Sequence, residues 1–281
     1  MSADPEDAPE TGATSIDSTR AGGTFFTEQP WGGLRRFTNA RIALGRAGHS
    51  LPTQAHLEFQ WAHAQARDAV HIPLDAPALC AQVSALGLEV LQLHSAAQDR
   101  ATYLRRPDWG RNLDAPSQGV LQDWRVARPS AAAPDVCFVL ADGLSALAVA
   151  GHAVPLLRAL LLKWNQHPQM QAVMAPVCVV EQGRVAVGDD VAERLGARLV
   201  VVLIGERPGL SSPDSMGIYI TWAPRVGRTD AERNCISNVR PEGLSIDLAA
   251  DKLLQLMRQA QALQLTGVGL KDDAPVSLPL G

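Results

Sequence analysis

Four short segments hold most of the residues that could do chemistry, and each comes after an apolar run. They are Asp142-Gly-Leu-Ser145, Gln182-Gly-Arg-Val185, Gly205-Glu-Arg-Pro-Gly209 and Glu232-Arg-Asn-Cys-Ile-Ser-Asn238. Ligands of open α/β sheets bind beyond the carboxyl ends of the strands, so these segments are expected to meet at one site. Their glycines let the backbone approach a ligand closely. The pattern therefore suits a bulky cofactor.

Glu206 is a candidate ligand-binding residue because it stands at a predicted strand end, beside Arg207 and before the rigid Pro208. Its carboxylate could accept hydrogen bonds from ligand amides, and the neighbouring guanidinium would limit the cost of burying it. An ion-paired surface loop is the alternative interpretation.

The cysteines fall into two groups. Cys137 and Cys178 lie inside apolar runs and are expected to pack in the core, whereas Cys235 lies among polar residues and is a candidate for ligand contact. A cysteine hydrolase built on Cys235 stays an alternative, but its thiolate would need a base, and every histidine lies at or before position 167.

No complete catalytic set is present. Asp142 could act as a general base, but Asp-Gly between a strand and a helix favours a turn, with Ser145 near the start of the helix. The four cysteines include no C-x-x-C pair and no zinc-like cluster, so no metal ligand is assigned, and a reducing cytosol suits them. We predict a binding site and assign no catalytic residue.

Composition excludes several classes of function. The net charge of −4 and the pI near 6.0 do not favour nucleic-acid binding. The strand-end loops match neither the P-loop pattern nor the dinucleotide-binding glycine pattern, so ATP and NAD are poor candidates. The acidic N-terminus lacks a signal-peptide pattern. The apolar stretch from Val136 to Trp164 is interrupted by polar residues and proline, which predicts a buried strand and helix and no membrane contact.

The elements that must position these loops are β-branched runs that alternate with helices. The predicted strands are Asp135–Leu140, Pro176–Glu181, Leu199–Ile204 and Ile218–Trp222. Between the second and third, Asp189 or Asp190 could cap a short helix that ends at Gly196. A long amphipathic helix from Ser245 to about Leu265 should cover one face of the sheet. The fold class is α/β, an open and mostly parallel sheet with flanking helices.

The remainder of the chain divides by composition. Residues 1–30 form an expected flexible tail, residues 31–130 a smaller helical region, and residues 131–281 the α/β domain. The helical region should contain a helix from about Leu51 to Val70, capped by Ser50 or Thr53, a second helix, and a short strand near Glu89.

Five motifs together resemble the light chain of ethanolamine ammonia-lyase. They are Ala40-Arg-Ile-Ala-Leu-Gly-Arg-Ala-Gly48, Tyr103-Leu-Arg-Arg-Pro-Asp108, Asp142-Gly-Leu-Ser145, Gly205-Glu-Arg-Pro-Gly-Leu210 and Cys235-Ile-Ser-Asn238. Their order and spacing also resemble that family, over about residues 31–269. The joint occurrence is far more specific than any single motif.

The resemblance implies a Rossmann-like, cobalamin-binding fold and a role in a radical ammonia-lyase. In that family a heavy chain with a β/α barrel carries the substrate site, and the light chain closes over adenosylcobalamin, a cobalt cofactor bound base-on. Matching positions imply that Val185, Glu206 and Cys235 contact the cofactor. The resemblance implies that the complete enzyme converts ethanolamine to acetaldehyde and ammonia.

The resemblance also implies partners and a location. The chain would join heavy chains in a hetero-oligomer with several copies of each, in the bacterial cytoplasm. Relatives targeted to a bacterial microcompartment begin with a short amphipathic helix, whereas residues 2–18 here contain proline, glycine and acidic residues. Encapsulation in a microcompartment is therefore doubtful. A stand-alone module that binds a small molecule or corrinoid is the alternative function, and it predicts a stable monomer that saturates with ligand alone.

Overall fold

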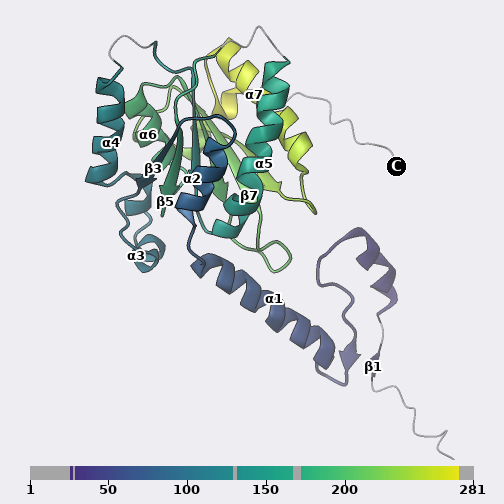
Figure 1. The fold of residues 1–281 in the computed structure, drawn as a ribbon. Coiled ribbons are helices and arrows are strands. Elements are labelled where there is room, and N and C mark those ends of the chain that lie inside the picture. The colour runs from purple at the N-terminus through teal and green to yellow at the C-terminus, as the bar shows by residue number, and fades with distance from the viewer. Residues whose placement is uncertain (1–25, 28, 129–131, 167–171, 272–281) are drawn as a thin grey trace, which may run out of the picture. The chain divides into compact units, whose positions relative to one another are not determined.

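The computed structural model describes residues 26–27, 29–128, 132–166 and 172–271. The chain divides after Gln60 into two compact units (Figure 1). In the first unit, strand β1 (Phe26–Thr27) pairs antiparallel with β2 (Arg46–Ala47), and the 3-10 helix η2 (Pro30–Phe37) lies between them in sequence. Helix α1 (Thr53–His71) begins in the first unit and ends in the second.

The second unit contains a six-stranded sheet and the remaining helices. Its strands are β3 (Val90–His94), β4 (Val136–Ala141), β5 (Val177–Glu181), β6 (Leu199–Gly205), β7 (Met216–Trp222) and β8 (Asn234–Val239). Its helices after α1 are α2 (Ala76–Ser84), α3 (Arg100–Arg105), α4 (Ala115–Val126), α5 (Ala146–Asn165), α6 (Val187–Leu195) and α7 (Ile246–Leu263). Short 3-10 turns follow α3, precede β8 and follow α7: η3 (Trp109–Arg111), η4 (Asp230–Glu232) and η5 (Gly267–Gly269).

The strand order is β3-β5-β4-β6-β7-β8, in which the first four strands run parallel. The α/β fold with a mostly parallel sheet is thus confirmed, with two corrections. Strand β7 runs antiparallel to β6, so its carboxyl end lies at the opposite edge of the sheet. Strand β8 then returns antiparallel to β7, whereas its residues were predicted to form a loop. The residues Asn234–Val239 lack the strict alternation of polar and apolar side chains that would have indicated this edge strand.

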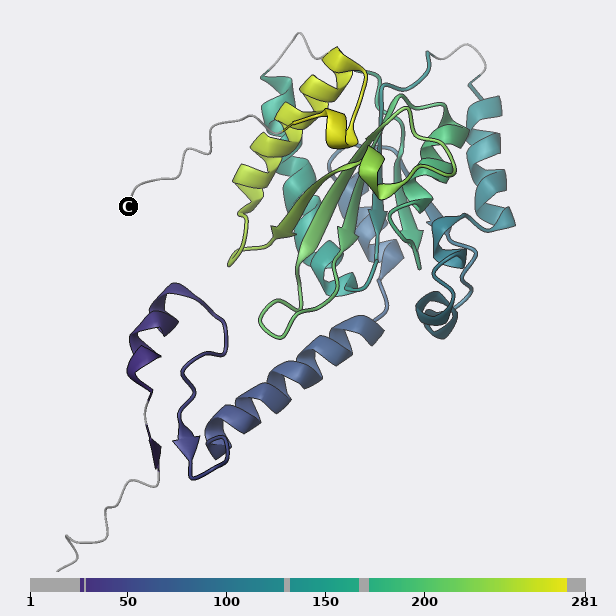
Figure 2. The same ribbon diagram turned by 180° about the vertical axis from the view of Figure 1, so that it is seen from behind.

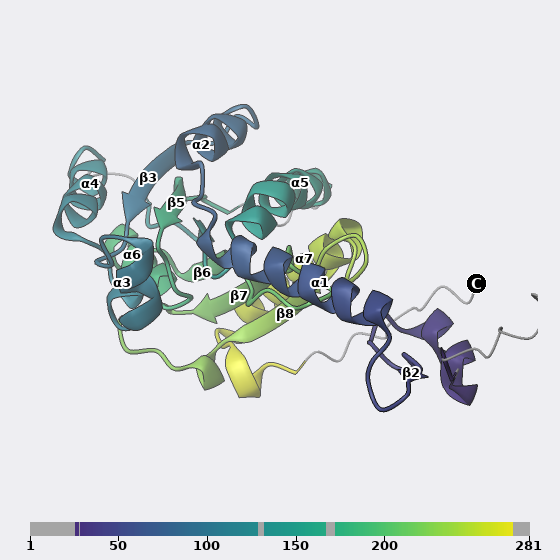
Figure 3. The same cartoon turned by 90° about the horizontal axis from the view of Figure 1, so that it is seen from below.

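Helices cover both faces of the sheet (Figures 2 and 3). On one face, apolar residues of α2, α5 and α7 form a core with inward residues of the strands, among them Phe138, Leu203 and Ile218. On the other face, residues of α4 and α6 pack against a second set that includes Val139 and Val202. Strands buried on both faces are nearly continuously apolar, and for this reason β4, β5 and β6 were recognisable in the sequence.

Helix α5 is the one helix in the described part of the chain that is long and apolar enough to cross a membrane by length and composition. Eight of its residues are buried, and it packs beside α7 over the sheet. The predicted combination of a buried strand and a buried helix is therefore confirmed. The Ser145 side chain caps α5 by accepting a hydrogen bond from the Ala148 amide at 3.3 Å.

The predicted cap of the next helix was wrong. Helix α6 begins after Ala186 without a side-chain cap, and it ends as predicted at Gly196, which has a φ of 72°. Asp189 and Asp190 instead lie buried in the first turn and make tertiary contacts. Asp190 accepts a hydrogen bond from the Leu113 amide at 2.9 Å, so these carboxylates join segments far apart in sequence.

Candidate functional site at the strand ends

A cavity of about 160 Å³ lies where β4, β5 and β6 end. Val185 and Glu206, two of the three predicted contact residues, line it together, although they follow different strands. The full lining is Tyr103, Gly143, Leu144, Arg184, Val185, Ile204, Gly205, Glu206, Arg207 and Tyr219. The structure thus brings three of the four chemistry-bearing loops to one edge of the sheet.

Glu206 directly follows β6 and lines the cavity, where two hydrogen bonds fix its carboxylate. Its Oε2 accepts a hydrogen bond from the Ser215 hydroxyl at 2.5 Å and from the Asn238 amide at 3.2 Å. Sequence reasoning expected Arg207 to support this carboxylate, but no ion pair joins the two residues in the described part of the chain. The partners come instead from the start of β7 and the end of β8.

Val185 is positioned by a loop between β5 and α6 that is fixed at three successive residues. Gln182 has a φ of 55°, a left-handed conformation that is uncommon outside glycine. The Gly183 amide donates to Asp142 Oδ1 at 3.0 Å, and the Arg184 amide donates to the Gly110 carbonyl at 2.7 Å. Arg184 and Val185 also line a second cavity of about 670 Å³ beside the start of α6.

Close backbone approach shapes the floor of the first cavity. Gly143 has a φ of 56°, and a Cβ atom there would lie 2.3 Å from the Gly205 carbonyl oxygen. A Cβ on Gly205 would lie 2.0 Å from the Ser145 carbonyl oxygen. Both distances are far below contact distance, so the loops after β4 and β6 can meet only because these two residues are glycines.

Cys235, the third predicted contact residue, lies on β8 directly opposite Tyr219 on β7. Tyr219 lines the cavity, so Cys235 joins the same neighbourhood across the ladder. The Cys235 thiol is exposed and lies 3.3 Å from the Ser237 hydroxyl. Burial, and then the nearby Cys235 thiol, raise the pKa of Tyr219. A hydroxyl and a phenol do not supply the base that a cysteine hydrolase needs.

Asp142 acts as a connection between loops. It is buried, and that burial raises the pKa of its carboxyl to about 6, while Arg100 and three backbone amides oppose the rise. Its two oxygens face the Gly183 amide and the Arg100 guanidinium, at 3.0 Å and 3.5 Å. The turn-forming interpretation of Asp142 therefore fits its contacts better than a general base does.

The roles of Tyr103, Tyr219, Arg100 and Arg184 in the site were not predicted from the sequence. Tyr103 is completely buried, and the guanidiniums of Arg100 and Arg184 both pack over its ring, at 4.6 Å and 4.1 Å from the ring centre. Tyr219 stood inside an apolar run that was taken simply as a strand. The only sequence signal for Tyr103 was its place in the Tyr103-Leu-Arg-Arg-Pro-Asp108 motif.

These features fit one part of a large, amide-bearing cofactor. A cavity of about 160 Å³ accepts a side arm and not a macrocycle, which would have to lie across the exposed edge beside Cys235 and Ser237. The anchored Glu206 carboxylate can accept hydrogen bonds from carboxamides such as those on the rim of a corrin. The glycine contacts at 143 and 205 bring the backbone to the same edge.

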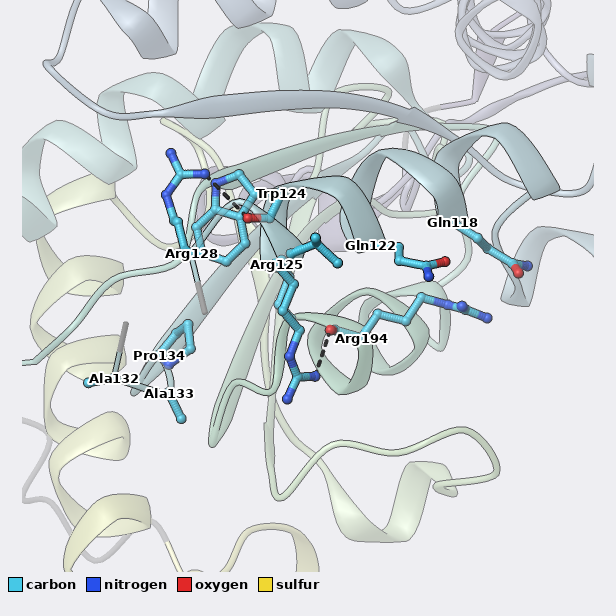
Figure 4. A pocket seen from close by; sticks show the side chains of 11 residues that line it. Gln118, Gln122, Trp124, Arg125, Arg128, Ala132, Ala133, Pro134 and Arg194 are labelled. Carbon is cyan, nitrogen blue, oxygen red and sulfur yellow. Dashed lines mark hydrogen bonds between the residues drawn. The ribbon is translucent and has the colours of Figure 1, made fainter. Parts of the chain in front are cut away.

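A different groove, of about 540 Å³, lies between α4 and α6 (Figure 4). It is near the amino ends of the parallel strands, and Arg125 donates to the Arg194 carbonyl at 3.1 Å within it. Cationic side chains at a helix C-terminus satisfy its free carbonyls, so this contact has a structural explanation. None of the predicted contact residues lines this groove.

Comparison with known proteins identifies the family of the chain. The family model described as ethanolamine ammonia-lyase light chain (EutC) matches residues 28–271. The ethanolamine ammonia-lyase small subunit of Ralstonia nicotianae is 61% identical over 257 residues, which cover 90% of this chain and 92% of that protein. The corresponding subunit of Azotobacter vinelandii is 60% identical, with 89% and 91% covered. The resemblance predicted from five motifs is thereby confirmed, and the chain belongs to the ethanolamine ammonia-lyase light chain family.

Proposed function

We propose that the strand-end cavity and the adjoining face of β7 and β8 form the light chain's share of the adenosylcobalamin site, with Val185, Glu206 and Cys235 in contact with the cofactor. One observation carries the proposal. These residues come from three separate segments, yet two of them line a cavity with Tyr219 and the third lies opposite Tyr219 in the ladder.

Membership of the family makes the chain a subunit of a carbon-nitrogen lyase that uses adenosylcobalamin. The bound cofactor supplies the radical chemistry that eliminates ammonia from ethanolamine. The residues of this chain hold and orient the cofactor. Glu206 accepts hydrogen bonds from cofactor amides, while Val185 and Tyr219 present apolar surface that excludes water. No catalytic residue is assigned to this chain.

The designation small subunit implies a heavy-chain partner. We infer that the heavy chain closes the exposed edge of the site and that residues 31–130 provide much of the contact with it. The 3-10 helix η2 has no buried residue, and Trp31 and Phe37 on it are exposed to 65% and 73%. Trp61 on α1 is exposed to 68%. Large aromatic residues exposed in this way are typical of protein interfaces.

The assembly is inferred to contain several copies of each chain and to function in the bacterial cytoplasm. The predicted flexible tail, and with it the segment that bears on microcompartment targeting, lies largely outside the described residues. The alternative of a stand-alone binding module differs in one respect that can be measured. It would saturate with cobalamin without a heavy chain.

Replacement of Glu206 by alanine tests the site. We expect Glu206→Ala to weaken cobalamin binding by the assembled complex about tenfold, because a charge-assisted hydrogen bond is lost. The matched control is Glu89→Ala, which removes an exposed carboxylate that binds Trp124 and Arg128 at the start of β3. Thermal melting of each variant shows whether the fold is kept. Unchanged affinity in a folded Glu206→Ala complex would contradict the assignment.

A further inference from the structure

One guanidinium, that of Arg100 in the first turn of α3, connects the loops of the cavity without lining the cavity itself. Its Nη1 donates to the Gly143 carbonyl at 2.8 Å and to the Gln182 side-chain oxygen at 3.2 Å. The same nitrogen lies 3.5 Å from Asp142 Oδ2. Its Nε donates to the Val70 carbonyl at 2.6 Å. Arg100 thus joins the end of α1 to the loops that follow β4 and β5.

A stack of side chains extends this connection to the cavity wall. The Tyr103 ring packs against the guanidiniums of both Arg100 and Arg184. Arg184 is held there by a hydrogen bond from its Nη2 to the Tyr103 carbonyl at 3.1 Å. Tyr103 and Arg184 both line the cavity, and Arg184 precedes Val185 in the chain. A displaced Arg100 side chain would therefore disturb Val185, a predicted cofactor contact, through Tyr103 and Arg184.

The loop that Arg100 holds has a backbone conformation that needs support. Gln182 has a φ of 55°, which L-residues with side chains rarely adopt. Its carbonyl accepts a hydrogen bond from the Ser95 hydroxyl at 2.7 Å, and its side chain accepts one from Arg100. Strained residues of this kind persist where the surroundings fix them, and they gather at binding sites.

We propose that Arg100 is a positioning residue for adenosylcobalamin: it fixes the Gln182–Val185 loop and Gly143 in the arrangement that forms the cavity, so that the site exists before the cofactor arrives. This proposal rests on the proposed cofactor site. An arginine suits the task because its rigid plane lets Nη1 reach the Gly143 and Gln182 acceptors while Nε reaches the Val70 carbonyl. A lysine keeps the positive charge beside Asp142, but it has one nitrogen in place of these two and no planar group to pack on the Tyr103 ring.

The test uses the complex of the full chain with its cognate heavy chain. In Arg100→Lys, we expect the KM for adenosylcobalamin and the Kd for cyanocobalamin to rise about tenfold, with kcat at saturating cofactor within about twofold of the unchanged enzyme. The control is Arg105→Lys, at the last position of the same helix, where the exposed side chain donates to Ala101 within α3. A role in folding alone would lower the melting temperature and leave the KM unchanged.

A second substitution tests whether Arg100 acts by supporting the backbone conformation of Gln182. Glycine adopts positive φ readily, so Gln182→Gly added to Arg100→Lys should recover part of the lost affinity. An unchanged KM in Arg100→Lys, or a loss confined to kcat, would overturn the positioning role. If Glu206→Ala weakens binding and Arg100→Lys does not, only this inference fails. If Glu206→Ala has no effect, the proposed site itself fails.

Discussion

Cys235 and Tyr219 are paired across the antiparallel ladder between β8 and β7, and the Cys235 thiol contributes to the raised pKa of Tyr219, of which burial is the larger cause. This pairing brings a residue from the last strand of the sheet to a cavity formed by loops after β4, β5 and β6. The site therefore depends on β8, the strand whose residues were predicted to form a loop. It also leaves the thiol exposed, at a place where a bound cofactor and a heavy chain would cover it.

Alkylation of the free chain should therefore modify Cys235 before the other cysteines. Cys137 and Cys178 are buried. The neighbouring Cys137 thiol and then burial raise the pKa of Cys178, and burial raises the pKa of the half-buried Cys80. In the assembled complex with cobalamin, the rate at Cys235 should fall at least about tenfold because the thiol is covered. Mass spectrometry of timed samples measures both rates. Equal rates in the free chain and in the complex would place Cys235 outside the site.

The glycines of the cavity floor should tolerate no side chain. We expect Gly205→Ala to lower the free energy of unfolding by about 2 to 4 kcal/mol, since the added Cβ would lie 2.0 Å from the Ser145 carbonyl oxygen. Gly151→Ala is the control, because Gly151 lies within α5 with open space where a Cβ would be. That change should stabilise the helix by about 0.5 to 1 kcal/mol. Urea unfolding measures both, and a tolerated Gly205→Ala would refute the close approach.

Asp142 should make stability depend on pH between about 4 and 6. Its pKa in the folded chain, about 6, lies above the ordinary value of 3.8, so the folded state binds this proton more tightly than the unfolded state does. The resulting stabilisation is complete below about pH 4 and is lost as the pH rises through 6. It amounts to about 3 kcal/mol for a shift of roughly two units.

The comparison that isolates this effect is with Asp142→Asn, which cannot titrate. Other acidic groups contribute equally to both proteins and cancel in the difference. The free energy of unfolding of the variant, minus that of the unchanged chain, should increase by up to about 3 kcal/mol between pH 4 and pH 7. A difference that stays constant over this range would show that Asp142 is not a protonated, buried carboxyl group in the folded chain.

The pair formed by Arg233 and Asp189 should hold β8 against α6. Both side chains are almost fully buried, and the guanidinium binds the carboxylate through two hydrogen bonds of 2.8 Å and 2.5 Å. Arg233→Ala would leave the aspartate buried without a partner and should cost about 3 to 5 kcal/mol of unfolding free energy. Arg67→Ala, which breaks an exposed pair with Asp68, should cost less than about 1 kcal/mol. Similar losses in the two variants would contradict the structural role of the buried pair.

The sequence predicted the fold well where burial dominates. Strands β4, β5 and β6 are covered on both faces, so their apolar runs were clear, and Ser145 and Gly196 marked helix ends by local chemistry alone. Strand β8 was missed because its buried residues, Ile236 and Val239, are three positions apart, so the segment lacks the strict alternation that indicates a strand. A register shift in its pairing with β7 accounts for this spacing. The direction of β7 was missed because an apolar run does not reveal whether its partner is parallel.

Three of the four loops chosen from the sequence meet at the strand ends, because the rule that places ligands at the carboxyl ends of parallel strands depends only on topology. The fourth, which contains Cys235, is largely strand β8. The stack of Arg100, Tyr103 and Arg184 could not be inferred, since it joins residues 81 positions apart whose contact exists only in the folded chain. The roles of Val185, Glu206 and Cys235 stay predictions.

The central claim is that this chain completes an adenosylcobalamin site that a heavy chain cannot complete alone. The most direct test is ethanolamine deamination by a cognate heavy chain with adenosylcobalamin, measured with and without an equal amount of this chain. We predict activity in the mixture and none above background with either chain alone. Equal activity with and without this chain, or no activity in a mixture of folded components beside an active control pair, would contradict the claim.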